Sequence, residues 1–382
     1  MIQALLARRK APEEIAPAIV VHRTLESVSP VWKAMDHEGH ATAFQKSDWF
    51  VSWAIHFAGP QSAEWLVMEI QDSGGAPLML LPFERRTTPE GLIRLAFVDL
   101  GAADYTGPVV AEGFSPDRRQ MQQIWDQVCR HLPRADVIHL QKMPERIGDV
   151  LNPLMLLDDV RPMGLNAWCV PLASSFAEWI KEALDPKFAS KMFERQRKLR
   201  KRGKLTFSVA TSAQERRQAF ETMRRQRARR CADLARNDIL QVPGGAEFYA
   251  QLLESDEGES LAAIAILCVD DEIIATGYGL VANETFHMIF PTLEPDRWRN
   301  YSPGIQMFLK TIEWCIERGL RNFDFTIGAE SFKKDFGAQP QALFEKTSAL
   351  GVRGLRAVID HHMRQKLRQY AFAKAMFRRV FT

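Results

Sequence analysis

The sequence predicts a mixed α/β protein in which one layered unit, a mixed and mostly antiparallel sheet flanked by helices, occurs twice. A run of hairpin, strand, loop, helix and strand appears in both halves of the chain. In each run one helix separates two strands, the pattern of a crossover connection. With 382 residues, 46% of them hydrophobic, the chain is long enough for two cores. We therefore expect domains over 1–165 and 166–352, followed by a basic helix over 353–382.

The first unit begins after a lead-in of about 40 residues without strong periodicity. Alternating apolar residues and turn signals predict a hairpin, a third strand, a loop, a helix and a fourth strand. Two further helices precede the hairpin. The expected strands cover 64–70, 77–83, 92–100 and 136–141, the loop covers 102–108, and the helices cover 31–38, 48–57 and 116–131.

The second unit repeats the same order. Its expected strands cover 261–269, 273–281, 284–290 and 322–327, and its helix covers 302–318. A basic helical stretch over 176–201, a strand over 205–210 and a second basic helix over 214–230 lie between the two units.

Composition favours a reducing compartment. The five cysteines are scattered and form no CxxC pair, which argues against a disulfide framework or a zinc ribbon. The first ten residues place apolar before basic residues, the reverse of a signal peptide. The longest apolar run, 261–269, is too short to span a membrane. We expect a cytoplasmic protein. No HExxH, GxSxG or P-loop motif is present, and we expect no metal site.

The helix over 302–318 has the clearest start signal in the chain. Ser302 suits the N-cap and Pro303 the first helical position, while Gly304 leaves room for a ligand. The unpaired N–H groups of a helix start bind phosphate well, and Arg299 and Asn300 precede them. The sequence predicts an anion-binding site here. A capped helix with a purely structural role is the alternative.

Four side chains around this helix are candidates for chemistry. Asp324 stands between two phenylalanines in the strand over 322–327, where its carboxylate could orient a substrate or accept a proton. A structural pair with Lys333 or Arg321 is equally open. His287 lies in the preceding strand and could act as a general base, although a lone strand histidine is more often structural. Tyr301 is a further candidate acid, and Lys333 a candidate anion contact.

Two cationic runs, 195–204 and 224–230, contrast with a net charge of only +3. They could be solvated helix faces, an anion clamp for a nucleotide-bearing cofactor, or an RNA contact. The absence of interleaved aromatic residues disfavours RNA, and nothing points to DNA. The basic tail over 353–382 could touch an anionic membrane surface or pack as a terminal helix.

Three segments together resemble a known family. They are YSPG at 301–304, FDFTIG at 323–328 and FKKDFG at 332–337. They are similar to CelD-like acetyltransferases of the GNAT superfamily, which are associated with cellulose and other exopolysaccharide synthesis in bacteria. Leu80 to Pro82, Asp104 with Tyr105, and the basic run before Gly203 also resemble that family.

The resemblance implies two tandem GNAT-like domains, as in the FemABX peptidyltransferases, and acetyl-CoA or another acyl-CoA as donor. Its pyrophosphate would lie at 299–304, in a loop with fewer glycines than the usual form. A small-molecule or saccharide acceptor would attack the thioester through an amine or hydroxyl. Transfer from aminoacyl-tRNA and a regulatory scaffold without catalysis remain alternatives. Asp324, His287 and Tyr301 are the catalytic candidates; the cofactor candidates are Arg299, Asn300, Tyr301, Ser302, Gly304 and Lys333.

Overall fold

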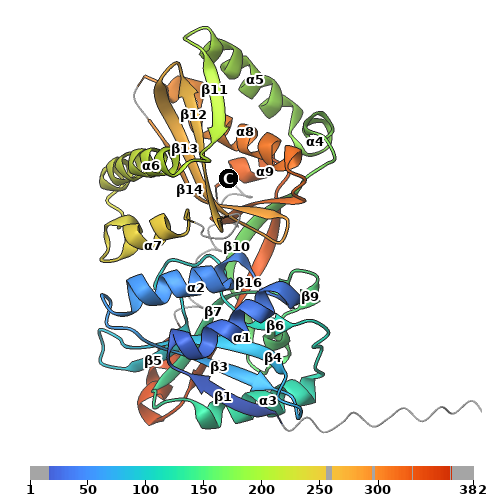
Figure 1. Cartoon of the computed structure of the whole chain (residues 1–382), viewed down its shortest axis with the longest axis vertical. Coiled ribbons are helices and arrows are strands. Elements are labelled where there is room, and N and C mark those ends of the chain that lie inside the picture. Colours follow the sequence, from blue (N-terminus) through green and yellow to red (C-terminus); the bar gives the residue numbers. More distant parts are fainter. Residues whose placement is uncertain (1–16, 255–259, 295–296, 329, 362, 364–382) are drawn as a thin grey trace, which may run out of the picture.

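The computed structural model describes residues 17–254, 260–294, 297–328, 330–361 and 363. Within them the chain forms two halves joined by one continuous 14-stranded sheet. The main path of this sheet runs β1-β3-β4-β5-β7-β16-β10-β15-β14-β13-β12-β11. The long strands β10 (Arg161–Pro171) and β16 (Gln339–Ala349) lie at its centre and connect the lower and upper halves of Figure 1.

The N-terminal half packs helices on both faces of its sheet. Met121 and Ile124 of α3 pack with Ile138 of β7 on one face, because alternate strand residues point to opposite sides. Trp32 of α1 and Phe50 of α2 pack on the other face. The bounds are β1 Ala18–His22, α1 Leu25–Glu38, β2 Gly39–His40, α2 Ser47–Trp53 with a π-turn Ala54–Ala58, β3 Glu64–Gln71, β4 Pro77–Thr87, β5 Ile93–Phe97, β6 Val109–Ala111, α3 Arg118–His131, β7 Val137–Pro144, β8 Arg146–Ile147 and β9 Val150–Leu151.

The C-terminal half repeats this plan with more helices. Phe308 and Leu309 of α8 pack against Phe323 of β15, and α6 covers the opposite side of the same sheet (Figure 1). The bounds are α4 Phe176–Ala183, α5 Pro186–Arg200, β11 Leu205–Val209, α6 Ala213–Asp233, α7 Gly245–Gln251, β12 Ala262–Val269, β13 Glu272–Ala282, β14 Thr285–Leu293, α8 Pro303–Glu317, β15 Asn322–Ile327 and α9 Phe332–Asp335.

The predicted duplication is confirmed by the strand pairing. In the first half β3, β4 and β5 are antiparallel neighbours, and β5 pairs with β7 in parallel after the crossover helix α3. In the second half β12, β13 and β14 are antiparallel neighbours, and β14 pairs with β15 in parallel after α8. The fold class predicted from the sequence is therefore correct.

Two parts of the prediction need correction. The helical stretch over 176–201 is two helices, because the Asp185 side chain caps a new start by accepting a 2.8 Å hydrogen bond from Phe188 N–H, and Pro186 follows at the first helical position. Strands β10 and β16 were not predicted. Strand β10 covers Arg161–Pro171 and connects the two halves. Strand β16 follows the whole second unit yet pairs with β7 of the first.

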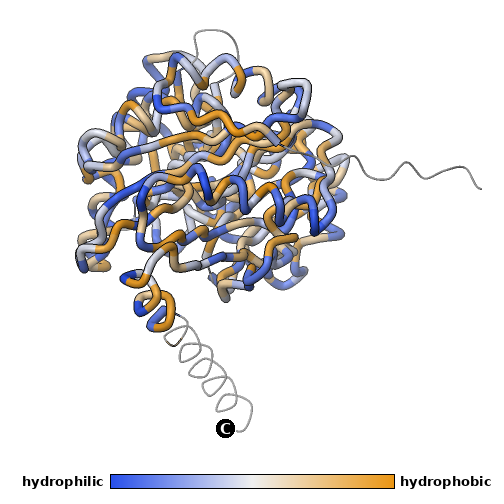
Figure 2. Tube along the Cα trace, turned by 90° about the horizontal axis from the view of Figure 1, so that it is seen from below, coloured by the Kyte–Doolittle hydropathy of each residue, from blue (hydrophilic) through white to orange (hydrophobic). Residues whose placement is uncertain are grey.

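The predicted C-terminal helix is described only over 352–361, and the rest of 353–382 apart from residue 363 lies outside the described residues. Its described start projects from the body in Figure 2. Large apolar side chains on it are exposed, namely Val352, Leu355, Ile359 and Met363. Among the described helices, none is both long enough and apolar enough to cross a membrane. The five cysteines are unpaired, as the sequence predicted.

Candidate functional site

Strands β14 and β15 pair in parallel over only three residues and then separate. The last paired residues are His287 and Asp324. A register shift in β14 follows immediately, where it pairs with β13, and such a bulge bends a strand away from its neighbour. Beyond this point a side chain replaces the backbone ladder, because Thr326 Oγ1 donates to Met288 O at 3.2 Å. The two predicted residues thus meet where the strands begin to diverge.

The carboxylate of Asp324 is buried and accepts three hydrogen bonds. Oδ1 accepts from the backbone N–H of Thr326 at 2.7 Å, and Oδ2 accepts from the Tyr105 hydroxyl at 2.6 Å. His287 Nδ1 lies 3.1 Å from the same Oδ2. Because a carboxylate oxygen in this contact accepts the hydrogen bond, the proton lies on Nδ1 and Nε2 is the unprotonated nitrogen of the neutral ring.

The backbone at Thr326 is strained in support of this arrangement. Its φ is 55°, in the left-handed region that a β-branched residue rarely adopts. Such a conformation costs about 1–3 kcal/mol and is retained where the surroundings impose it. Here it aims the Thr326 N–H at Asp324 and the hydroxyl at β14. Strain of this kind is common at functional sites.

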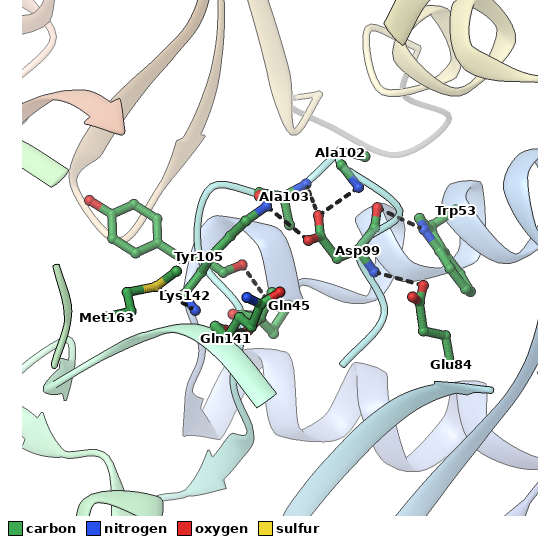
Figure 3. Close-up of polar contacts among 12 residues, drawn as sticks. Gln45, Trp53, Glu84, Asp99, Ala102, Ala103, Tyr105, Gln141, Lys142 and Met163 are labelled. Carbon is green, nitrogen blue, oxygen red and sulfur yellow. Dashed lines mark hydrogen bonds and ion pairs between the residues drawn. The ribbon is translucent and has the colours of Figure 1, made fainter. Parts of the chain in front are cut away.

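Tyr105 comes from the other half of the chain, from the loop after β5. Figure 3 shows the cluster that shapes this loop, with the Tyr105 ring pointing away from it. Asp99 Oδ1 accepts from Ala103 N–H at 2.9 Å, and Lys142 Nζ bridges Asp99 Oδ2 at 2.8 Å and Ala103 O at 2.7 Å. Gln45 Nε2 donates to Tyr105 O at 3.0 Å. The N-terminal half therefore fixes one member of the site.

Burial and charge perturb the titrating groups around Asp324. Burial, followed by the Asp324 charge, raises the pKa of Tyr105 well above its usual value, so Tyr105 stays a hydrogen-bond donor. The same two causes raise the pKa of Cys169, which faces Asp324 across the β10–β15 pair. Burial raises the pKa of Asp104 to about 6, against the opposing effect of Lys142. The Tyr105 hydroxyl and the Cys169 thiol therefore stay protonated beside the Asp324 carboxylate.

The start of α8 lies beyond the end of β14, because the crossover returns the chain to pair β15 in parallel. Ser302 adopts φ 53° at the N-cap, and its side chain caps no backbone N–H. Instead, the Arg195 guanidinium of α5 donates to Ser302 Oγ. Arg202 Nε donates to the Tyr301 hydroxyl at 2.8 Å. Two arginines from the predicted basic run therefore reach the predicted anion-binding turn.

A pocket of about 460 Å³ opens beside this turn. Its lining combines cationic and aromatic side chains, namely Arg202, Val269, Asp270, Arg297, Trp298 and Tyr301. Arg299 and Asn300 are exposed in the turn itself. A Cβ added at Gly304 would meet Leu293 Cδ2 at 3.1 Å, so the helix start packs tightly against the end of β14.

The remaining predicted residues lie apart from Asp324 and His287. Tyr301 lies beyond the end of β14 at Leu293. That end is six residues from His287 and therefore about 20 Å away along an extended strand. Lys333 is buried, and its ammonium contacts Phe325 O at 3.2 Å, Thr326 O at 3.3 Å and Glu330 at 3.1 Å. These contacts hold the C-terminal end of strand β15 in place.

The sequence did not identify Tyr105, Thr326 or Arg195 as site residues. Tyr105 carried one usable signal, because its loop occupies the same place in the first unit as 299–304 in the second. Arg195 carried a weaker one, since it begins the cationic run 195–204 that the sequence offered as an anion clamp. Thr326 carried none, since a strand-end threonine is common.

The duplicated crossover units define the class of the protein as a tandem α/β fold. Residues 186–334 match the acetyltransferase (GNAT) domain, so the C-terminal half carries a GNAT-type domain. No curated protein sequence matches the chain.

Solved structures support the same fold over most of the chain. The chain is similar to FemX, with a TM-score of 0.58 and 11% identity, over 86% of this chain and 96% of that one. It is similar to the C-terminal domain of a putative lysylphosphatidylglycerol synthetase from Agrobacterium fabrum, with a TM-score of 0.53 and 10% identity, over 89% and 97% of the two chains. At these identities the likeness concerns the fold alone.

Proposed function

We propose that the protein is an acyl-CoA-dependent acyltransferase that moves an acyl group, with acetyl as the simplest case, to an amine or hydroxyl. One observation carries this proposal. The buried Asp324–His287 pair lies at the point where β14 and β15 diverge, and the start of α8 lies at the open end of the same two strands. One pair of strands thus positions both a proton acceptor and an anion-binding helix start.

The residues at the helix start fit the donor's pyrophosphate. The first-turn N–H groups of α8 and the guanidinium of Arg195 supply donors and positive charge, and Gly304 has no side chain to block them. Arg299, Asn300, Tyr301 and Ser302 form the turn around that point. Lys333 remains a proposed contact for the donor. It would act by holding the end of β15 in place. When bound, acyl-CoA would supply the thioester.

His287 would act as the general base. Asp324 holds the proton on His287 Nδ1, so Nε2 is the atom that takes the proton from the acceptor. As Nε2 becomes protonated, the adjacent carboxylate stabilises the imidazolium. Tyr105 keeps Asp324 oriented by a short hydrogen bond from the opposite half. Such positioned proton transfer contributes about 10²–10⁴ in rate.

Native mass spectrometry after incubation with a panel of acyl-CoAs tests this proposal. We expect a one-to-one complex with at least one donor. The wild type should slowly lose or transfer the acyl group, and His287→Gln should do so at a lower rate. A protein that binds no member of the panel contradicts the donor assignment. A regulatory scaffold would bind without transfer and keep its cellular role in both His287→Gln and Asp324→Asn.

The exposed cations of α5 and α6 favour aminoacyl-tRNA as a second candidate donor. Arg197, Arg200, Arg217 and Arg225 are exposed on these helices. Others are already engaged within the chain, since Arg227 pairs with Asp238 at 2.6 Å. Binding of tRNA that falls steeply with added salt, together with no acyl-CoA binding, would favour this candidate.

We also propose that the C-terminal helix contacts an anionic membrane, consistent with an acceptor in exopolysaccharide or envelope synthesis. Leu355, Ile359 and Met363 recur at helical spacing and are about half exposed, while Arg353 and Arg356 flank them. We expect co-sedimentation with phosphatidylglycerol-containing vesicles and not with neutral phosphatidylcholine vesicles, and its loss in the double variant Leu355→Glu, Ile359→Glu. Equal sedimentation of wild type and variant would refute this contact.

A further inference from the structure

Three side chains from separate elements converge on the sheet of the N-terminal half, away from Asp324. His139 lies in β7, Glu345 in β16, and His361 in the helix over 352–361. His139 Nε2 lies 3.3 Å from Glu345 Oε2, and His361 Nε2 lies 3.3 Å from Glu345 Oε1. The two imidazole rings meet edge to face with centroids 4.8 Å apart. One carboxylate therefore has an imidazole nitrogen at each oxygen.

These separations are compatible with a metal centre as well as with two long hydrogen bonds. N–H···O bonds have donor–acceptor distances of about 2.7–3.2 Å and charge-assisted ones are shorter, so 3.3 Å is long for both contacts. A tetrahedral zinc ion with ligands at about 2.0–2.2 Å requires ligand atoms about 3.3–3.5 Å apart. One ligand atom from each residue can be chosen so that all lie within 4.8 Å of one another. Binding of the ion would require side-chain rotations that bring the most distant ligand atoms closer together.

Two of the three side chains are largely buried, and the third is partly exposed to solvent. The side chain of Glu345 is 7% exposed and that of His139 13%, whereas that of His361 is 30% exposed and gives solvent access. Thr347 lies directly opposite His139 in the strand register, hence on the same face. Its buried hydroxyl has no hydrogen-bond partner among the described residues. This is a polar group without an assigned role beside the cluster.

One cationic side chain lies close enough to His139 to interact with it electrostatically. The nearby cation Arg94 is held by Glu84, with Nη2 3.4 Å from Oε1.

We propose that His139, Glu345 and His361 bind a divalent transition-metal ion of the zinc type, with the fourth position open to water. Two imidazoles and one carboxylate are a known ligand set for zinc, with distances as above. The ion would tie the C-terminal helix to the central strands, and so hold its exposed apolar side chains in place. The sequence predicted no metal site because the ligands are 206 and 16 residues apart and form no local motif.

Calorimetric titration of the metal-stripped full chain with Zn²⁺ tests this site. We expect one ion per chain, and at least tenfold weaker binding in His361→Ala and in Glu345→Gln. His131→Ala is the matched control, because His131 is an exposed histidine bonded to Gln127 O on α3, and it should bind as wild type does. Failure of the wild type to bind Zn²⁺, or equal affinity in His361→Ala, would overturn the proposal.

Hydrogen exchange gives a second readout that does not depend on enzymatic activity. Zn²⁺ should slow exchange over 352–361 in the wild type and in His131→Ala, and leave it unchanged in His361→Ala. Because His361 is the most exposed of the three ligands, this variant is expected to keep its fold, which circular dichroism checks. Slowed exchange of equal size in His361→Ala would show that Zn²⁺ acts elsewhere.

Discussion

The Tyr105 hydroxyl of the N-terminal half donates a 2.6 Å hydrogen bond to Asp324 Oδ2 in the C-terminal half, 219 residues away in the chain. The same oxygen lies 3.1 Å from His287 Nδ1. A loop of the N-terminal half therefore contacts the pair that we propose for proton transfer in the C-terminal half. The continuous sheet that joins the two halves holds both partners of this bond in a fixed arrangement.

Tyr105→Phe should destabilise the protein by about 1.5–3 kcal/mol, the range for a hydrogen bond to a charged group. The phenyl ring keeps the packing against Phe44, whose centroid lies 5.8 Å away, so the loss reports the hydroxyl. Urea unfolding followed by fluorescence measures it. Tyr301→Phe serves as the control, since Tyr301 accepts from Arg202 near the surface. An equal effect of both substitutions would contradict the special role of the Tyr105 bond.

His287→Gln should lower kcat by about 10²–10⁴ and leave the Kd for the donor unchanged, because His287 lies away from the turn that would hold the pyrophosphate. Asp324→Asn should give a loss of similar size, since an amide no longer fixes the proton on His287 Nδ1. Single-turnover kinetics with the preferred acyl-CoA separate chemistry from binding. A normal kcat in both variants would remove the pair from the mechanism.

Gly304→Val should weaken acyl-CoA binding at least tenfold. The added side chain enters the helix start, where even a Cβ lies 3.1 Å from Leu293 Cδ2. Gly59→Val is the matched control, because nothing lies within 4 Å of a Cβ at that position. Equilibrium dialysis with labelled donor measures both. Unchanged affinity in Gly304→Val would place the pyrophosphate elsewhere.

Glu84 predicts a dependence of stability on pH. Burial, and next the charge of Asp99, raises its pKa from 4.5 to about 7 in the folded protein. The folded state then binds the proton more tightly than the unfolded state, so this contribution to stability is full below pH 4.5 and is lost as pH rises to about 7. The loss is about 3 kcal/mol.

Glu84→Gln should remove that dependence. Between pH 5 and pH 8 the free energy of unfolding of the wild type should fall relative to the variant, as measured by urea titration at each pH. The variant keeps a side chain of the same size beside Arg94, so packing is a minor difference. Parallel curves for the two proteins across this range would show that Glu84 does not carry the proton.

Local signals account for the parts of the fold that the sequence predicted well. Strand β15 matches its predicted bounds, and α8 lies within one residue of the prediction, because Ser302, Pro303 and Gly319 mark its ends. Strand β16 has no such signal. It begins with Gln339 and Pro340, and its pairing with β7 depends on residues about 200 positions away.

The residues of the candidate site also divide into those with a local sequence signal and those without one. His287 and Asp324 were recognisable as polar residues in adjacent core strands, and their meeting follows from the parallel register of β14 and β15. Tyr105 was visible only as a loop residue. Its contact with Asp324 depends on how the two halves pack, which no local pattern records.

Calorimetric titration with acetyl-CoA, on wild type and on Arg195→Gln, tests the central claim most directly. Arg195 contacts Ser302 at the start of α8 and does not touch Asp324 or His287 in the structure. The proposal predicts saturable one-to-one binding to the wild type and at least tenfold weaker binding to Arg195→Gln. No binding to the wild type at millimolar acetyl-CoA, or the same affinity in both proteins, would contradict it.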